Sequence, residues 1–166
     1  MQTFIHSTIG LIHVIASILS LILGTVVLLT GKGTQLHKSI GYGYALMMLI
    51  VNGTAFGLYG LFGKFGPFHV AALVSLATLV AGMLPVMLRK SNWLIQHFSF
   101  MYYSVIGLYA AFASEVIVRI PGIPFGPAVG LATAMVMISA MIVFRSVSRH
   151  WQVRYNQTKT HLNKSL

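Results

Sequence analysis

Four histidines stand at or near the ends of long apolar segments, one for each of the first four segments. They are His13, His37, His69 and His97. Imidazole is the commonest metal ligand in proteins, and two imidazoles on facing helices are what an axially ligated haem iron requires. A single histidine at a helix end is more often an interfacial side chain whose polar tip stays in water. The repeated pattern favours metal or haem binding by at least one pair.

The alternating direction of consecutive helices sorts these histidines into two pairs. His13 and His69 fall on one side of the membrane and form the outer pair, whereas His37 and His97 fall on the other side and form the inner pair. Each pair joins segments n and n+2, which lie diagonally opposite in an antiparallel four-helix bundle. We therefore expect the two imidazoles of each pair to converge in space.

Glu115 is the only acidic side chain among 166 residues, against eleven Lys and Arg, and it lies inside the apolar stretch 98–118. An ionisable group at such a depth costs roughly 2.5–3.5 kcal/mol on insertion scales, so it usually has a function or a partner. With His13 and His69 it would form a two-histidine, one-carboxylate site for zinc or non-haem iron, with an open position for water. Such a site could support hydrolysis or oxidation at the lipid interface.

Arg119 follows Glu115 by one helical turn, which leaves two further alternatives. The two side chains could form a structural ion pair. In a haem protein Arg119 would instead meet a haem propionate, and Glu115 could orient a ligand histidine without binding the iron itself.

The elements that must position these residues are apolar segments long enough to cross a bilayer. The chain is 57% hydrophobic and only 7% charged, which is typical of a membrane protein with several spans. Segments of this length without alternating polarity predict helices. We therefore expect an all-α membrane protein with five transmembrane helices, the first four forming an antiparallel bundle, at residues 9–29, 40–62, 69–88, 98–118 and 128–144.

The basic residues indicate how the helices are oriented. Nine Lys and Arg fall in the first and third loops and the tail, whereas only Lys64 and Arg119 fall on the opposite side. This bias predicts an outer N-terminus and a cytoplasmic C-terminus in a bacterial inner membrane. We expect one transmembrane domain at 1–144 and a basic cytoplasmic tail at 145–166. Because the charges lie in short loops and a tail, they argue against nucleic-acid binding.

The absence of cysteine limits the cofactors that the chain could bind. Disulfides, thiolate metal sites, iron–sulfur clusters and covalently attached c-type haem all require cysteine. Haem b, zinc and non-haem iron remain, because histidine and carboxylate side chains can hold them.

The run Lys32-Gly-Thr-Gln-Leu-His37-Lys-Ser-Ile-Gly41, taken with the other three histidines and Glu115, resembles an uncharacterised family of predicted bacterial membrane proteins. The resemblance extends from about Gly10 to Arg119 and implies a membrane location without implying an activity. The four histidines also resemble those of transmembrane di-haem cytochrome b families, which pair them between helices n and n+2 and carry electrons across a membrane.

These observations lead to one functional expectation and two alternatives. We expect transmembrane electron transfer through histidine-ligated b-type haem, or assembly of a respiratory haem protein. The lipid bilayer is the expected surrounding, and a quinone or a respiratory complex is a candidate partner. The first alternative is a zinc- or iron-dependent membrane hydrolase or oxidoreductase that uses the outer site. The second is a non-catalytic membrane protein with a structural Glu115–Arg119 pair.

Overall fold

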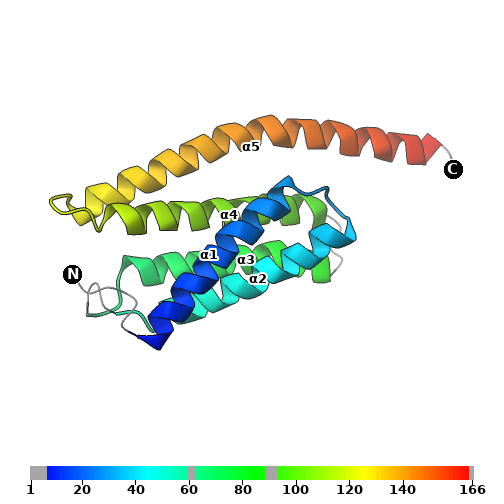
Figure 1. Ribbon diagram of the computed structural model, residues 1–166. Coiled ribbons are helices and arrows are strands. Elements are labelled where there is room, and N and C mark those ends of the chain that lie inside the picture. Colours follow the sequence, from blue (N-terminus) through cyan, green and yellow to red (C-terminus); the bar gives the residue numbers. More distant parts are fainter. Residues whose placement is uncertain (1–6, 60–62, 89–92, 165–166) are drawn as a thin grey trace. The chain divides into compact units, whose positions relative to one another are not determined.

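The computed structural model describes residues 7–59, 63–88 and 93–164, with side chains described as far as residue 146. Within these ranges helices joined by turns are the only regular secondary structure, and there are no strands, as the sequence predicts (Figure 1). It divides into two compact units, Met1–Ala111 and Phe112–Leu166. The helices are α1 (Thr8–Leu29), α2 (Gln35–Ala55), α3 (Pro67–Met87), α4 (Trp93–Ile117) and α5 (Phe125–Lys164).

Four stretches of the described helices are long and apolar enough to cross a membrane. They are α1, α3, α4 and the part Phe125–Ser146 of α5. This confirms four of the five predicted spans by length and composition. The span expected from α2, the antiparallel arrangement of the bundle and its orientation stay predictions.

The bounds predicted for the second span are wrong. The sequence suggests 40–62, of which residues 60–62 lie outside the described ranges, whereas α2 begins at Gln35 and ends at Ala55. Thr34 sets the start, because its Oγ1 accepts a hydrogen bond from the His37 N–H at 3.1 Å and so satisfies a free amide of the first turn. The helix therefore has a polar first turn.

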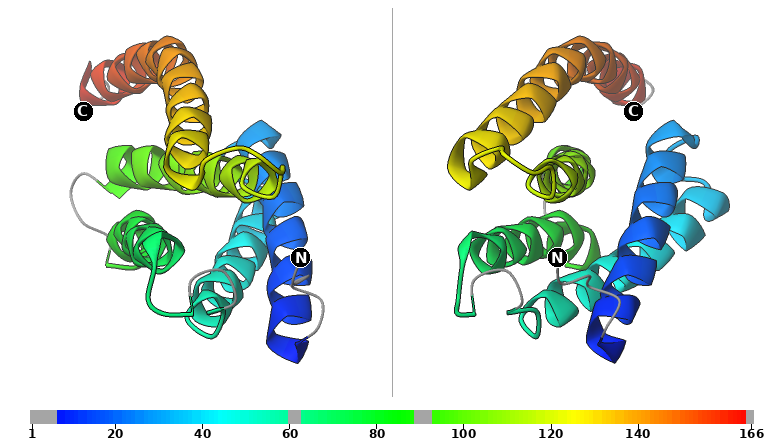
Figure 2. Two further views of the ribbon diagram at one scale, coloured as in Figure 1. Left: turned by 90° about the vertical axis from the view of Figure 1, so that its left-hand side faces the viewer. Right: turned by 60° about the vertical axis from the view of Figure 1, so that its left-hand side comes forward.

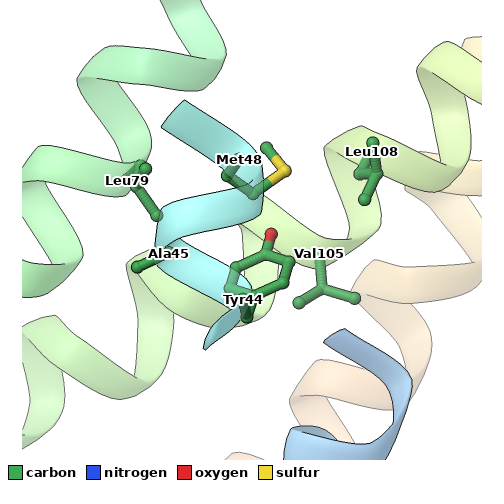
Figure 3. Packing of buried hydrophobic residues seen from close by; sticks show 6 residues of the cluster. All are labelled: Tyr44, Ala45, Met48, Leu79, Val105 and Leu108. Atoms are coloured by element: carbon green, nitrogen blue, oxygen red, sulfur yellow. The ribbon is translucent and has the colours of Figure 1, made fainter. Parts of the chain in front are cut away.

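Helix α2 supplies much of the core of the first unit. Tyr44, Ala45 and Met48 of α2 pack with Leu79 of α3 and with α4, and Tyr44 is fully buried. Figure 3 shows Leu79 on one side of α2 and the α4 residues Val105 and Leu108 on the other. Apolar residues of α1 cover this cluster, among them Leu21, Leu23 and Leu28. A helix shielded in this way can carry more polar residues than one that faces lipid.

Large apolar side chains on the outside of the first unit match a hydrocarbon surrounding. Along α1, Ile12, Ile15, Ile18 and Ile22 are each close to half exposed, and other large apolar side chains are exposed on α3 and α4. In water such a surface would favour association, whereas in a bilayer it faces lipid tails.

Hydroxyl pairs join helices of the first unit through the apolar interior. Tyr44 Oη lies 2.9 Å from Ser104 Oγ, which links α2 to α4. Thr25 gives its proton to the Leu21 carbonyl at 2.7 Å, so its oxygen accepts the hydroxyl hydrogen bond from Tyr109 of α4. Bonds of this kind between membrane helices average about 0.6 kcal/mol in double-mutant cycles.

Gly24 allows α1 to approach this interior closely. A Cβ at Gly24 would lie 3.0 Å from Tyr44 Cε2 and 3.2 Å from both methyl groups of Val105. Figure 2 shows α1 and α2 side by side, in agreement with the short distances that a Cβ added at Gly41 or Gly57 would have, 3.8 Å to Val27 Cγ2 and 3.3 Å to Ile9 Cγ2. The start of α1 thus lies beside the end of α2.

The second unit contains the end of α4 and helix α5. A turn with Gly122 in the left-handed conformation, at φ 85°, precedes α5. Ser114 Oγ of α4 lies 3.2 Å from Thr133 Oγ1 of α5, so a hydroxyl pair also joins the helices of this unit. Helix α5 continues without a break past residue 144, where the sequence predicts the end of the last span.

We expect Gly24→Ala to destabilise the protein by roughly 1–3 kcal/mol, the usual cost of an added methyl group in a well-packed core. The Tyr44 ring cannot move away freely, because its hydroxyl is held by Ser104. The thermal midpoint of the purified protein in detergent should fall. Gly107→Ala is the matched control, since a Cβ there meets nothing within 4 Å. Equal midpoints for the two variants would contradict the close approach of α1.

The Tyr44–Ser104 bond can be tested separately with Tyr44→Phe, Ser104→Ala and the double variant. Each single change should lower the free energy of unfolding, and the double change should cost about 0.6 kcal/mol less than their sum, because both remove the same bond. Reversible unfolding in mixed micelles measures these values. Strictly additive losses would mean that the two hydroxyls do not interact.

Candidate functional site

A capped turn between α1 and α2 places Lys32 and His37. Gly33 adopts the left-handed conformation, with φ 80°, which an L side chain rarely tolerates. The Lys32 ammonium then donates to the last carbonyls of α1, to Val27 O at 2.8 Å and Leu28 O at 2.7 Å. A cation at this position satisfies free carbonyls and complements the negative end of the helix dipole. The Lys-Gly-x3-His run therefore forms a fixed structure.

The rings of His37 and His97 converge, as predicted for the inner pair. Their centroids lie 6.4 Å apart with the ring planes at 83°. His37 lies in the first turn of α2 and His97 in the second turn of α4, because both helices begin about five residues earlier than the predicted spans 40–62 and 98–118. Nitrogens that share one metal lie at most about 4 Å apart, twice a metal–nitrogen bond of ~2.0–2.1 Å. Each ring centroid lies about 1 Å behind its nitrogen, so the observed centroid separation of 6.4 Å is compatible with two nitrogens bound to one ion. The same separation is compatible with a direct edge-to-face contact of the two rings.

Hydrogen bonds fix which nitrogen of His97 could bind a metal. Its Nδ1 lies 2.9 Å from the Gly82 carbonyl of α3, and a carbonyl only accepts, so Nδ1 carries the proton. In neutral imidazole Nε2 then keeps its lone pair. Ligand histidines usually have this arrangement, with the second nitrogen donating to a carbonyl or carboxylate. His37 adds a buried Nδ1 that has no hydrogen-bond partner.

Close packing of α3 on α4 positions the Gly82 carbonyl. A Cβ at Gly82 would lie 2.7 Å from Met101 Sδ and 3.2 Å from Phe100 Cβ, so only glycine permits this approach without displacement. Gly82 thus both allows the contact and supplies the acceptor for His97.

Charge and burial at this end favour neutral imidazole. The pKa of His37, in the polar first turn of α2, is lowered first by burial, then by the positive charge of Lys32 and by His97, while the Val27 backbone acts in the opposite direction. Burial also lowers the pKa of Lys32. An imidazole must be unprotonated at the binding nitrogen to hold a metal, so these effects agree with a ligand role.

The outer pair has no such ring contact, although both histidines approach the end of α2. His13 Nδ1 lies 2.9 Å from Thr54 Oγ1. Thr54 gives its own proton to backbone carbonyls, at 2.7 Å to Ile50 O, so it accepts from His13 Nδ1–H. His13 Nε2 therefore keeps a lone pair.

His69 has the opposite proton arrangement. The Gly66 N–H donates to His69 Nδ1 at 3.1 Å, so in the neutral ring the proton is on Nε2. The bond closes a capping box at the start of α3, which Pro67 begins. Nε2 is then a donor without a lone pair, and this geometry favours a donor role for His69 over metal ligation.

Glu115, near the end of α4, and Arg119, in the turn that follows this helix, form an ion pair within the second unit. Both side chains are about one-third exposed, at 32% and 40%. This is the contact expected if the two form a structural pair. In the described ranges no three His, Cys, Asp or Glu side chains gather as a metal-binding group. The zinc or iron site of His13, His69 and Glu115, and the propionate contact of Arg119, stay predictions.

Three features of these sites were not predicted from the sequence. The spacing Gly66-Pro-Phe-His69 contains the capping signal, because the third residue of a helix can bond back to the N-cap amide. Asn52 is buried at 2% exposure and its Nδ2 has no hydrogen-bond partner. The Gly82 acceptor could not have been found, since it depends on how α3 packs against α4.

The comparison with known families agrees with the apolar helices. Residues 10–152 match the family model described as Predicted membrane protein (DUF2306). No curated protein and no solved structure matches the chain. The resemblance to di-haem cytochrome b families is not shown by these comparisons. Since the match covers most of the sequence, the chain belongs to this family of predicted membrane proteins.

Proposed function

We propose that the inner pair, His37 and His97, binds a metal-centred cofactor, with the iron of b-type haem as the favoured form. On this proposal the protein carries electrons in the membrane or takes part in assembling a respiratory haem protein. The observation that carries it is the approach of the two imidazoles, with ring centroids 6.4 Å apart.

The protonation of the pair supports the proposal. His97 donates from Nδ1–H to the Gly82 carbonyl, so its Nε2 is unprotonated and has a lone pair for a metal. Nδ1 of His37 is buried without a hydrogen-bond partner, which costs about 1–3 kcal/mol of folding free energy. A rotation of the imidazole that directed Nδ1 at a bound ion would remove this cost. These donors are the neutral imidazoles that haem iron and divalent metals accept.

Haem held by His37 and His97 would supply one-electron transfer. The protein's own contribution is to hold two imidazoles in place. Lys32 also places a positive charge near His37, which would stabilise an anionic group such as a propionate. That charge is fixed by its bonds to the end of α1.

We place this site near the cytoplasmic side of a bacterial inner membrane. The basis is the charge bias of the loops, which puts the first loop, with Lys32, on the side that carries most Lys and Arg. The antiparallel four-helix bundle belongs to the same proposal, as does a quinone or a respiratory complex as the electron partner.

We expect the purified full-length protein, loaded with haem, to have a Soret band that His37→Ala and His97→Ala each remove. Each variant would lack one of the two histidines that would hold the iron, so the two should behave alike. His161→Ala, in the C-terminal tail, is the control and should keep the spectrum. Visible absorption and metal analysis measure occupancy. Equal occupancy in all three variants would contradict the proposal, and zinc without haem would reassign the metal.

Gly82→Ala should weaken cofactor binding about tenfold, because loss of a hydrogen-bond partner behind a ligand histidine typically costs 10–100-fold in affinity. The added methyl group would push against Met101 and move the carbonyl from His97. Gly53→Ala is the matched control, since its Cβ meets nothing within 4 Å. Titration with haem gives both affinities, and equal values would exclude a positioning role for Gly82.

A further inference from the structure

Two buried hydrogen-bond donors, one on His69 of the outer pair and one on Asn52 of α2, have no acceptor among the described residues. His69 is 4% exposed and its Nε2 is unpaired, while Asn52 is 2% exposed and its Nδ2 is unpaired. An unsatisfied buried donor costs about 1–3 kcal/mol, and native proteins contain few of them. Two at one end of the same unit suggest a missing acceptor.

Asn52 lies about one helical turn before a residue that contacts His69. Phe56 is the C-cap of α2 and follows Asn52 by four residues with helical backbone angles, so the two residues lie on the same side of that helix. The Phe56 ring lies 6.3 Å from the His69 ring. Asn52 therefore lies one helical turn from Phe56, on the side of α2 that carries the contact with His69.

The proton on His69 Nε2 is fixed by the fold. Gly66 donates to Nδ1, so the free nitrogen can only donate unless the capping bond breaks. A metal ion needs a lone pair and therefore cannot bind this nitrogen. An oxygen that accepts a hydrogen bond can.

Aromatic rings surround the His69 imidazole. Phe65 lies 4.9 Å away and stacks on it, and Tyr59 lies 4.8 Å away at a tilt of 32°. Tyr59 and Phe65 are themselves about half exposed, at 46% and 53%. Because neither ring is held in the core, both could shift to admit a flat ligand beside them.

We infer that this end of α2 and α3 binds a lipid-soluble ligand whose head is a flat ring with carbonyl oxygens, that is, a molecule of the quinone class. The carbonyls would accept from His69 Nε2–H and Asn52 Nδ2–H, and the ring would stack among Phe56, Tyr59 and Phe65. Stacking of aromatic rings contributes about 0.5–1.5 kcal/mol beyond the area buried. The site is separate from His37 and His97, so it does not rest on a cofactor there.

Binding of a short-chain benzoquinone to the full-length protein in nanodiscs tests the inference. Equilibrium dialysis should give saturable binding above that of empty nanodiscs. His69→Phe keeps an aromatic ring and removes the donor, and Asn52→Leu keeps the approximate volume. Each should weaken binding about tenfold, the factor that one hydrogen bond of typical net strength supplies. His69→Gln, which keeps an N–H donor, should recover part of the affinity.

His97→Ala is the control, because it removes the inner pair and should leave quinone binding unchanged. If His97→Ala lost the haem spectrum but still bound quinone, the result would support a quinone site that is independent of the inner pair. Absence of saturable binding would overturn it. So would unchanged affinity in both His69→Phe and Asn52→Leu, which would indicate that water alone satisfies the two donors.

Discussion

Hydrocarbon offers no hydrogen-bond partner, so polar groups within membrane helices depend on partners inside the protein. Most of this chain follows that constraint. Tyr44 is hydrogen-bonded to Ser104 and Thr25 to Tyr109. Lys32 caps the C-terminus of α1, and Thr34 caps the N-terminus of α2. The few buried side-chain atoms that remain unpaired are therefore informative. Among the described residues they belong to Ser20, His37, Asn52 and His69.

The same constraint distinguishes histidines that look alike in the sequence. His97 donates to a carbonyl and His13 to a hydroxyl, so each keeps a lone pair on Nε2. His69 accepts from a backbone amide and is left with a proton on Nε2. Three imidazoles in similar positions thus have two different chemistries. Only the inner pair combines a fixed lone pair with a second ring at a distance that suits a shared ion.

The sequence predicts the class of this protein well because apolar length is a local property. Four spans, the helical class and the convergence of His37 with His97 follow from segment length and alternating direction. The bounds of α2 do not, since Thr34 caps the helix before the apolar stretch begins and Ala55 ends it early. The role of His69 also depends on a capping bond that competes with ligation. The Gly82 carbonyl requires knowledge of how α3 and α4 pack, which no local pattern contains.

The absence of cysteine gives a direct test of whether residues 37 and 97 can share one ion. Cysteine at both positions would provide two thiolates, which bind the soft ion Cd²⁺ strongly. The measurement is the thiolate-to-cadmium absorption of the double variant His37→Cys/His97→Cys, compared with each single variant. Convergence of the pair predicts one ion per chain bound by both sulfurs, much more tightly than in either single variant. Equal, weak binding in all three proteins would contradict it.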